Sequence, residues 1–256
     1  MAENYFGSQI TRDIWSNQEN IILIFAGTAA DFALNPSVDW LFFTGEIPSH
    51  PQLRFIETFA FNRMLFFSNK EKVPQIVQQI MDIHKHVETK RSVSEGPHKI
   101  PNEAFIQVSD MLIEYGIRGY EYLHHTKLTD IQKDTYYQDI KKIDELMHIQ
   151  GLDDNYEFFL IRRNKTVSNE LNVNKFTPLL YKAYENDIGI IRYKIFLNFQ
   201  SYFINPAIAY KLNLKKHIFF QIFYTAYPYI RNKLLLLIIY KLFLKKETII
   251  ALKRYK

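Results

Sequence analysis

The chain has 256 residues, no cysteine, and 32 basic against 27 acidic side chains, which gives a formal net charge of +5. With 47% hydrophobic and 23% charged residues it has the composition of a folded globular protein, and its length favours one large domain. The lack of cysteine excludes disulfides, thiol catalysis, cysteine-bound zinc and iron–sulfur clusters. The chain has eight glycines and no glycine-rich phosphate loop, which argues against the common nucleotide-binding folds.

The charge is distributed unevenly along the chain. Residues 211–256 contain eleven Lys or Arg and one acid, Glu247, so they carry +10, whereas the rest of the chain carries −5. A basic, apolar end suits an anionic membrane surface or a nucleic acid. We favour the membrane, and expect no nucleic-acid partner, because the basic residues are interleaved with Leu and Ile and no nucleic-acid-binding motif occurs. The residues expected at the membrane surface are Lys215, Lys216, Lys245, Lys246, Lys253 and Arg254.

The N-terminal residues show no secretory signal, because a basic stretch followed by an apolar stretch and a small-residue cleavage site is absent there. The most apolar run, residues 234–244, is interrupted by Lys241 and is shorter than the roughly 18 residues that a membrane-spanning helix needs. We therefore expect a cytoplasmic protein, with peripheral contact at the inner membrane surface through the basic end.

Helical periodicity dominates, and no alternating pattern is long enough for a sheet. In chain order we expect an apolar helix over 20–34, a short helix from Pro36 to Phe43 capped by Asn35, and helices over 53–67, 73–88, 102–124 and 130–147; residues 153–177 are ambiguous, and helices beyond 176 are separated at Pro206, Asn213 and Pro228. Capping boxes are predicted at 68–71 and at 129–132. The pattern predicts an all-α protein: one large multi-helix domain over 1–212, and C-terminal helices over 213–256 that pack on that domain or on a membrane.

The helix expected over 73–88 carries two histidines that face different ways. Steps of three and four place His84 on the same face as Val77 and Ile80, whereas His86 lies about 200° further around the helix. An imidazole among aliphatic side chains needs hydrogen-bond partners or a metal. From the residues alone, a core histidine bonded to backbone or tyrosine is the commoner case, and a metal ligand is the alternative. We expect His86 to be a solvated surface residue.

The preceding helix places Arg54 and Thr58 one turn apart, and therefore on the same face. If an arginine in so aromatic a helix is buried, it must pair with an anion, for which Glu57, Glu46 or a cofactor carboxylate are candidates. The alternative is an arginine that extends to solvent from the start of the helix. On the helix expected over 130–147, Asp130, Asp134, Asp139 and Asp144 occur among lysines, which indicates a solvated face.

Several short motifs then occur in a recognisable order. They are Gly27, residues 33–38 (ALNPSV), Arg54-x-x-x-Thr58, residues 83–87 (IHKHV), a helix entered by Pro101, and Arg118-Gly119-Tyr120 followed by Leu128-Thr129 and Tyr136-Tyr137. In this order the chain resembles the mpaB-type and latex-clearing-protein (rubber oxygenase) catalytic domain, over about residues 21–212. One departure is Glu57, which stands where rubber-cleaving members carry a lysine.

The resemblance implies an all-helical oxidoreductase that binds b-type haem through one imidazole and oxidatively cleaves C=C bonds of apolar substrates. By position, His84 is then the iron ligand, and Arg54 and Thr58 are catalytic and haem-pocket residues. The predicted function is a haem-b-dependent oxygenase that acts with dioxygen on an apolar small molecule, of isoprenoid or lipid-like type. The alternative is a non-catalytic helical protein that binds membrane surfaces through its basic C-terminal end.

Overall fold

A computed structural model describes residues 5–39, 51–90, 99–232 and 234–235 of the chain. The side chains of residues 53, 54, 56, 89 and 90 are outside this description. Over the described ranges the secondary structure is helical, apart from one isolated antiparallel bridge between Tyr5 and Asn69. The predicted all-α class is therefore confirmed.

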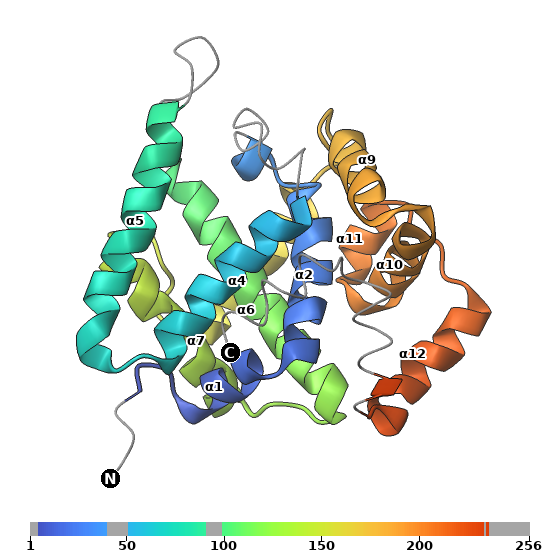
Figure 1. Cartoon of the computed structure of the whole chain (residues 1–256), viewed down its shortest axis with the longest axis horizontal. Coiled ribbons are helices and arrows are strands. Elements are labelled where there is room, and N and C mark those ends of the chain that lie inside the picture. Colours follow the sequence, from blue (N-terminus) through green and yellow to red (C-terminus); the bar gives the residue numbers. More distant parts are fainter. Residues whose placement is uncertain (1–4, 40–50, 91–98, 233, 236–256) are drawn as a thin grey trace.

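The helices follow one another with short connections (Figure 1). They are α1 (Gln9–Ser16), α2 (Gln18–Phe32), α4 (Pro51–Phe67), α5 (Val73–Lys90), α6 (Asn102–His124), α7 (Asp130–Leu146), α8 (Tyr156–Asn169), α9 (Thr177–Ile188), α10 (Ile190–Phe203), α11 (Pro206–Lys211) and α12 (Ile218–Ile230). Short 3-10 turns occupy residues 36–39 and Lys70–Lys72. None of these helices is both long and apolar enough to cross a membrane.

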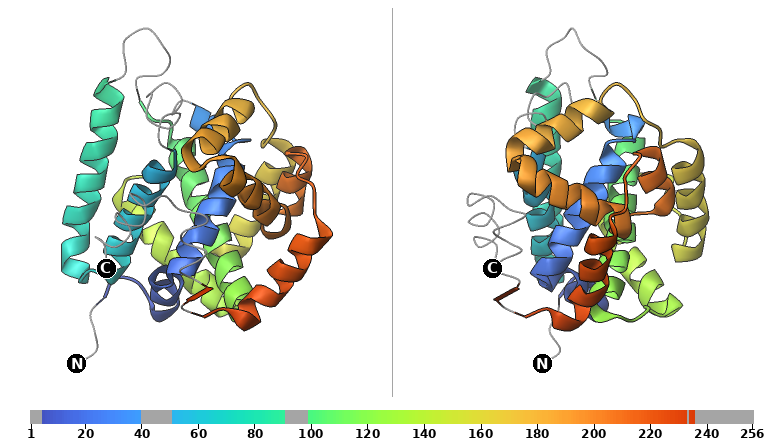
Figure 2. Two further views of the ribbon diagram at one scale, coloured as in Figure 1. Left: turned by 45° about the vertical axis from the view of Figure 1, so that its right-hand side comes forward. Right: turned by 90° about the vertical axis from the view of Figure 1, so that its right-hand side faces the viewer.

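Helix α2 is the centre of the fold, and its most extensive packing is along α6. Helix α4 lies between α2 and α5, which forms the outer wall on the left of Figure 1. Helices α9 and α10 lie on the other side of α2, and α12 lies at the opposite end of the molecule from α5 (Figures 1 and 2). Because every residue of α2 from Asn20 to Phe32 is buried, this helix is enclosed on all sides.

Two glycines allow α2 and α6 to approach each other closely. A Cβ atom on Gly27 would lie 2.1 Å from Cδ1 of Tyr115, and one on Gly119 would lie 2.0 Å from Oδ1 of Asn20. Both distances are far below van der Waals contact, so neither position accepts a larger residue without displacing the neighbouring helix. This crossing sets the positions of the helices that form the site.

The predicted helix boundaries were correct for α6 and α7. Thr129 and Gln132 form the predicted capping box at the start of α7, and His125 ends α6 in a left-handed conformation (φ 54°). The capping box predicted at 68–71 was wrong. Because α4 extends to Phe67, Ser68 lies at the C-terminal end of a helix, where its hydroxyl donates to the carbonyl of Met64 (2.7 Å).

Proline 228 does not separate two helices, as the sequence suggested, but lies inside α12. A proline lacks the N–H that would bond to the carbonyl four residues earlier. In this fold the carbonyl of Tyr224 instead accepts a hydrogen bond from the hydroxyl of Tyr122 on α6 (2.7 Å). The tertiary contact therefore supplies a donor that the proline cannot.

Other expectations were met or lie outside the described residues. Asn35 caps the turn that begins at Pro36, and its Oδ1 accepts from the N–H of Ser37 (3.0 Å), but the rest of that predicted helix is outside the described residues. The ambiguous stretch 153–177 contains α8. The division at residues 212 and 213 stays a prediction, as residues 236–256 are also outside the description.

Candidate functional site

A cavity lies among helices α4, α5, α6 and α7 and reaches the C-terminal half of α2. The cavity itself has a volume of about 180 Å³. It opens to solvent, and the empty space of the cavity and its open mouth together is about 1360 Å³. Its walls are mainly aliphatic and aromatic. The polar or ionisable side chains among them are Thr28, Glu57, Thr58, Asn62, His84, Ser109 and Asp144.

Helix α5 places its two histidines in different environments, as its periodicity predicted. His84 is half-buried and lines the cavity, with its ring edge-on to Phe105 (5.1 Å between centroids, 87° between planes), whereas His86 is exposed. Val73 and Val77, on the inward face, are buried. The predicted orientation of both histidines is confirmed.

Helix α4 contributes Thr58 to the cavity that His84 lines from α5. The backbone carbonyl of Thr58 accepts a hydrogen bond from Nδ2 of Asn62 (3.0 Å), which also lines the cavity. Arg54 lies one turn earlier in α4, and its side chain is outside the described part of the structure. Thus the fold brings Thr58 and His84 to one cavity, and Arg54 is on the same helix as Thr58.

Helix α7 contributes a carboxyl group that the sequence interpretation missed. Asp144 was assigned to a solvated face, but it is 5% exposed, lines the cavity, and accepts a hydrogen bond at Oδ1 from the hydroxyl of Ser109 (2.8 Å). Burial raises the pKa of Asp144 from its ordinary 3.8 to about 8. The signal was present in the sequence, since Tyr137, Ile140 and Asp144 follow one another at steps of three and four.

The solvated-face interpretation was also wrong for Asp139, for a different reason. Asp139 is buried where α1 packs against α7, and its Oδ2 accepts from the hydroxyl of Thr11 and the backbone N–H of Ser8, both at 2.7 Å. Here α1 covers a face that the sequence of α7 alone suggests is exposed. Asp130 and Asp134, nearer the start of α7, are exposed and half-buried respectively.

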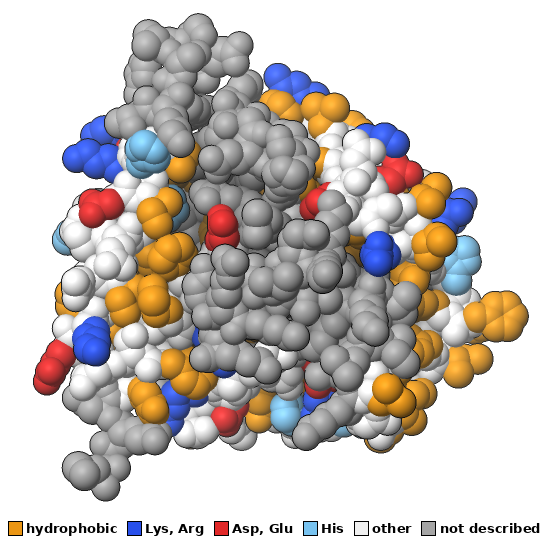
Figure 3. All heavy atoms as spheres, in the orientation of Figure 1, with side chains coloured by type: hydrophobic (Ala, Val, Ile, Leu, Met, Phe, Trp, Pro, Cys, Tyr) orange, Lys and Arg blue, Asp and Glu red, His pale blue; other side chains and the backbone are white. Residues whose placement is uncertain are grey.

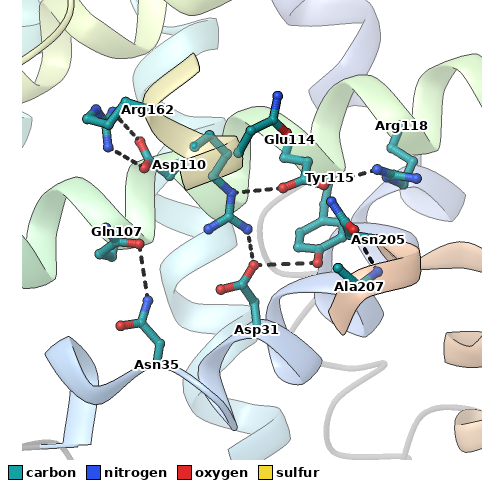
Figure 4. A network of polar contacts seen from close by, with 12 residues as sticks. Asp31, Asn35, Gln107, Asp110, Glu114, Tyr115, Arg118, Arg162, Asn205 and Ala207 are labelled. Atoms are coloured by element: carbon teal, nitrogen blue, oxygen red, sulfur yellow. Dashed lines mark hydrogen bonds and ion pairs between the residues drawn. The ribbon is translucent and has the colours of Figure 1, made fainter. Parts of the chain in front are cut away.

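A second polar cluster, the buried ion-pair network, lies between α2, α6 and α8. The guanidinium of Arg163, which is 2% exposed, donates from Nε to Glu114 (2.8 Å) and from Nη2 to Asp31. Tyr115 also donates to Asp31 (3.5 Å; Figure 4). Burial raises the pKa of Asp31 to about 6, although Arg163 opposes this shift.

Next to that network, the side chain of Arg162 joins α8 to α6. It forms a two-point pair with the carboxylate of Asp110 (2.6 and 2.9 Å; Figure 4) and a further bond to Asp153 (2.7 Å). Sequence reasoning missed both arginines because the stretch that contains them was not assigned to a helix, so no face could be given to either.

Among the described side chains that line the cavity, His84 is the one that carries an imidazole. Over the described ranges, no three His, Asp or Glu side chains are close enough together to hold a metal ion. A single imidazole would suit an iron whose remaining protein-independent donors come from a macrocycle, so His84 could hold a haem iron. At about 180 Å³ the cavity is smaller than cofactor pockets of about 300–1,000 Å³, so a haem would extend into the part that is open to solvent.

Residues 22–159 match the family described as the catalytic domain of the ER-bound oxygenase mpaB/B′ and of rubber oxygenase. The match covers more than half of the chain, and every residue that lines the cavity falls within it. The chain therefore belongs to this oxygenase family, and it is an oxidoreductase, as the motif order predicted. No curated protein and no solved structure matches it.

Proposed function

We propose that the protein is a haem-b-dependent oxygenase that uses dioxygen to oxidise an apolar, isoprenoid- or lipid-like small molecule. The observation that supports this most directly is the position of His84, whose imidazole faces a mainly apolar cavity together with Thr58. Family membership supports the oxygenase chemistry. Haem dependence and the substrate are our inference.

In this proposal the haem supplies the dioxygen chemistry when it is bound, and the chain's own residues hold and surround it. His84 would hold its iron through the imidazole. Thr58 provides a hydroxyl on the wall formed by α4, and Arg54, one turn earlier, provides the positive charge that a haem carboxylate requires. The aromatic side chains of Phe55 and Phe59 exclude water from the cavity and favour an apolar substrate.

The visible spectrum of the purified protein tests the haem assignment. We expect a Soret band in the wild type, its loss in His84→Ala, and its retention in His86→Ala, because only the first imidazole lines the cavity. His86→Ala is a matched control on the same helix, two residues away. If both variants keep the band, the ligand assignment is wrong, and if the wild type reconstituted with haemin shows none, haem dependence is wrong.

We also propose that the enzyme contacts an anionic membrane surface through α12. This helix contains no charged residue, and its outer side chains Ile218, Phe219, Ile222 and Tyr229 are all more than 60% exposed. Figure 3 shows hydrophobic side chains gathered at the right-hand edge of the molecule, where α12 lies. An apolar helix next to basic residues suits the interface of an anionic bilayer.

The basic residues named for this contact divide into two groups. Lys215 and Lys216 precede α12 and are exposed, whereas Lys245, Lys246, Lys253 and Arg254 are outside the described residues. Because the chain belongs to an enzyme family, we retain only the membrane-binding part of the alternative function, and no longer a non-catalytic protein. The cytoplasmic location stays a prediction.

Flotation with phosphatidylcholine vesicles, with and without phosphatidylglycerol, tests the membrane proposal. We expect binding to the anionic vesicles, lost in the double variant Phe219→Asp and Ile222→Asp because two charges would enter the apolar interface. Ile131→Asp, at an exposed position on α7, is the matched control and should still bind. Equal binding of the double variant and the control would show that α12 is not the contact.

A further inference from the structure

Asp144 is an unusual group in the wall of an apolar cavity. It lies on α7 next to cavity-lining aliphatic residues, including Ile140 and Met147, and it accepts a hydrogen bond from the neutral hydroxyl of Ser109 on α6. Ser109 also lines the cavity. The two side chains therefore form one polar spot, the Asp144–Ser109 pair, between α6 and α7, while the other polar side chains of the cavity come from α2, α4 and α5.

The charged side chains near the Asp144–Ser109 pair form ion pairs with one another. Within the described part of the chain Asp144 has no ion pair, and the neighbouring acids each have their own cation. The pairs are Arg162 with Asp110 (2.6 Å), Lys141 with Glu145 (3.9 Å) and Lys142 with Asp139 (3.2 Å). On the other helices that line the cavity, the titratable groups are Glu57 of α4 and His84 of α5.

A buried carboxylate with one hydrogen bond and no cation is costly, which favours the neutral acid form of Asp144. The elevated pKa, about 8, agrees with this, and Asp110 and Glu145 add to it because their negative charges disfavour a third. In the neutral form one oxygen accepts from Ser109 and the other carries a proton. A protonated carboxyl is a hydrogen-bond donor, and its natural partner is a neutral oxygen atom.

We propose that the Asp144–Ser109 pair is the polar anchor of the substrate site, and that it binds a neutral oxygen-bearing group, a carbonyl or hydroxyl, on an otherwise apolar molecule. This rests on the proposed function and narrows its substrate class. The acid proton of Asp144 donates to the ligand oxygen, while the hydroxyl of Ser109 holds the other carboxyl oxygen in place. Asp144 thus determines which end of the ligand lies at this wall, because the apolar walls bind either end equally well.

Three probes of nearly equal shape separate the alternatives: ethylbenzene, acetophenone and 1-phenylethylamine. Each is a small molecule, and they differ only in carrying no polar group, a carbonyl or a cation. Binding to the full chain, as purified, is measured by isothermal titration calorimetry from pH 6 to pH 9. We expect acetophenone to bind at least as tightly as ethylbenzene at pH 6, despite the hydration that its carbonyl loses.

The variants isolate the anchor from the cavity. In Asp144→Leu we expect the affinity for acetophenone relative to ethylbenzene to fall about tenfold, the value of one hydrogen bond. Asp144→Asn retains a neutral donor, so it should keep the preference but lose the weakening that the wild type shows above about pH 8. Met147→Leu changes an apolar position of the same wall and should alter neither.

The outcomes distinguish failure of the anchor from failure of the proposed function. If ethylbenzene binds and Asp144→Leu leaves the ratio unchanged, the anchor is wrong while an apolar substrate site stands. If 1-phenylethylamine is preferred and binds more tightly as the pH rises, the carboxylate recognises a cation and the proposal is overturned. If none of the probes binds, the anchor is also wrong, whereas haem dependence is decided separately by the Soret band.

Discussion

The cavity and the buried ion-pair network both bury acidic side chains, but only the network pairs them with a buried cation. In the network, Arg163 bonds to both Asp31 and Glu114, so that buried negative charge is compensated by a buried cation. In the cavity, Asp144 has the hydroxyl of Ser109. Compensated charges hold α2, α6 and α8 together, whereas the uncompensated acid is available to a ligand. Three changes test this difference: two single substitutions, the larger expected effect first, and then a change of pH.

Replacing the central cation should break the network. In Arg163→Met, Asp31 loses its cation, and we expect the free energy of unfolding, measured with urea, to fall by about 3–5 kcal/mol. Arg118 pairs with the same Glu114 (3.0 Å) but its side chain is 35% exposed, so Arg118→Met should cost no more than about 1 kcal/mol. Equal losses in the two variants would contradict a structural role for the buried cation.

The glycine at the crossing of α2 and α6 tests whether the network needs the close approach of the two helices. Gly27→Ala should lower the free energy of unfolding by about 1–3 kcal/mol, since the new methyl group would overlap the ring of Tyr115, whose hydroxyl reaches Asp31. Helix propensity alone predicts the opposite sign, a gain of about 1 kcal/mol. Thermal or urea unfolding therefore decides by the direction of the change.

The ionisation of Asp144 should make the free energy of unfolding depend on pH. The pKa of Asp144 is raised from 3.8 to about 8, so between these values the unfolded chain releases a proton that the folded protein keeps. The contribution of Asp144 to the free energy of unfolding is therefore greatest below about pH 4. It decreases as the pH rises to about 8, with a slope of up to about 1.4 kcal/mol per pH unit. Asp144→Asn should remove that decline.

Urea unfolding of both proteins at several pH values between 5 and 8 measures the effect. Asp31, whose pKa is also raised, to about 6, contributes a decline of the same sign to both proteins, so the difference between their curves isolates Asp144. Parallel curves would mean that Asp144 is ionised in the folded state, and the contrast between cavity and network would disappear.

The sequence predicted features that depend on one helix and its caps. Periodicity alone separated His84 from His86, and the spacing of Thr129 and Gln132 predicted the start of α7. The motif order predicted the family. The first two require only local information, because helix geometry fixes which side chains share a face.

Features that depend on a second helix were missed. The acids of α7 were interpreted as solvated, but α1 covers Asp139, and Asp144 faces the cavity between α6 and α7. Likewise, Pro228 was expected to separate two helices but lies inside α12, where the hydroxyl of Tyr122 on α6 donates to the carbonyl of Tyr224 that the proline leaves without its helical donor. A single sequence gives the faces of a helix but not the partners that cover them.

The hydrogen bond from Tyr122 to Tyr224 also limits how the molecule can sit on any surface. The carboxylate of Glu19 on α2 also accepts hydrogen bonds from Tyr227 and from Arg231 (2.7 Å). These contacts hold the inner side of α12 against the helical core, so α12 cannot rotate about its axis and its exposed side keeps one direction. Helices α12 and α5 lie at opposite ends of the long axis (Figure 1). A bilayer contact through α12 would therefore fix the orientation of the enzyme and hold the wall that carries His84 at the far end of the molecule.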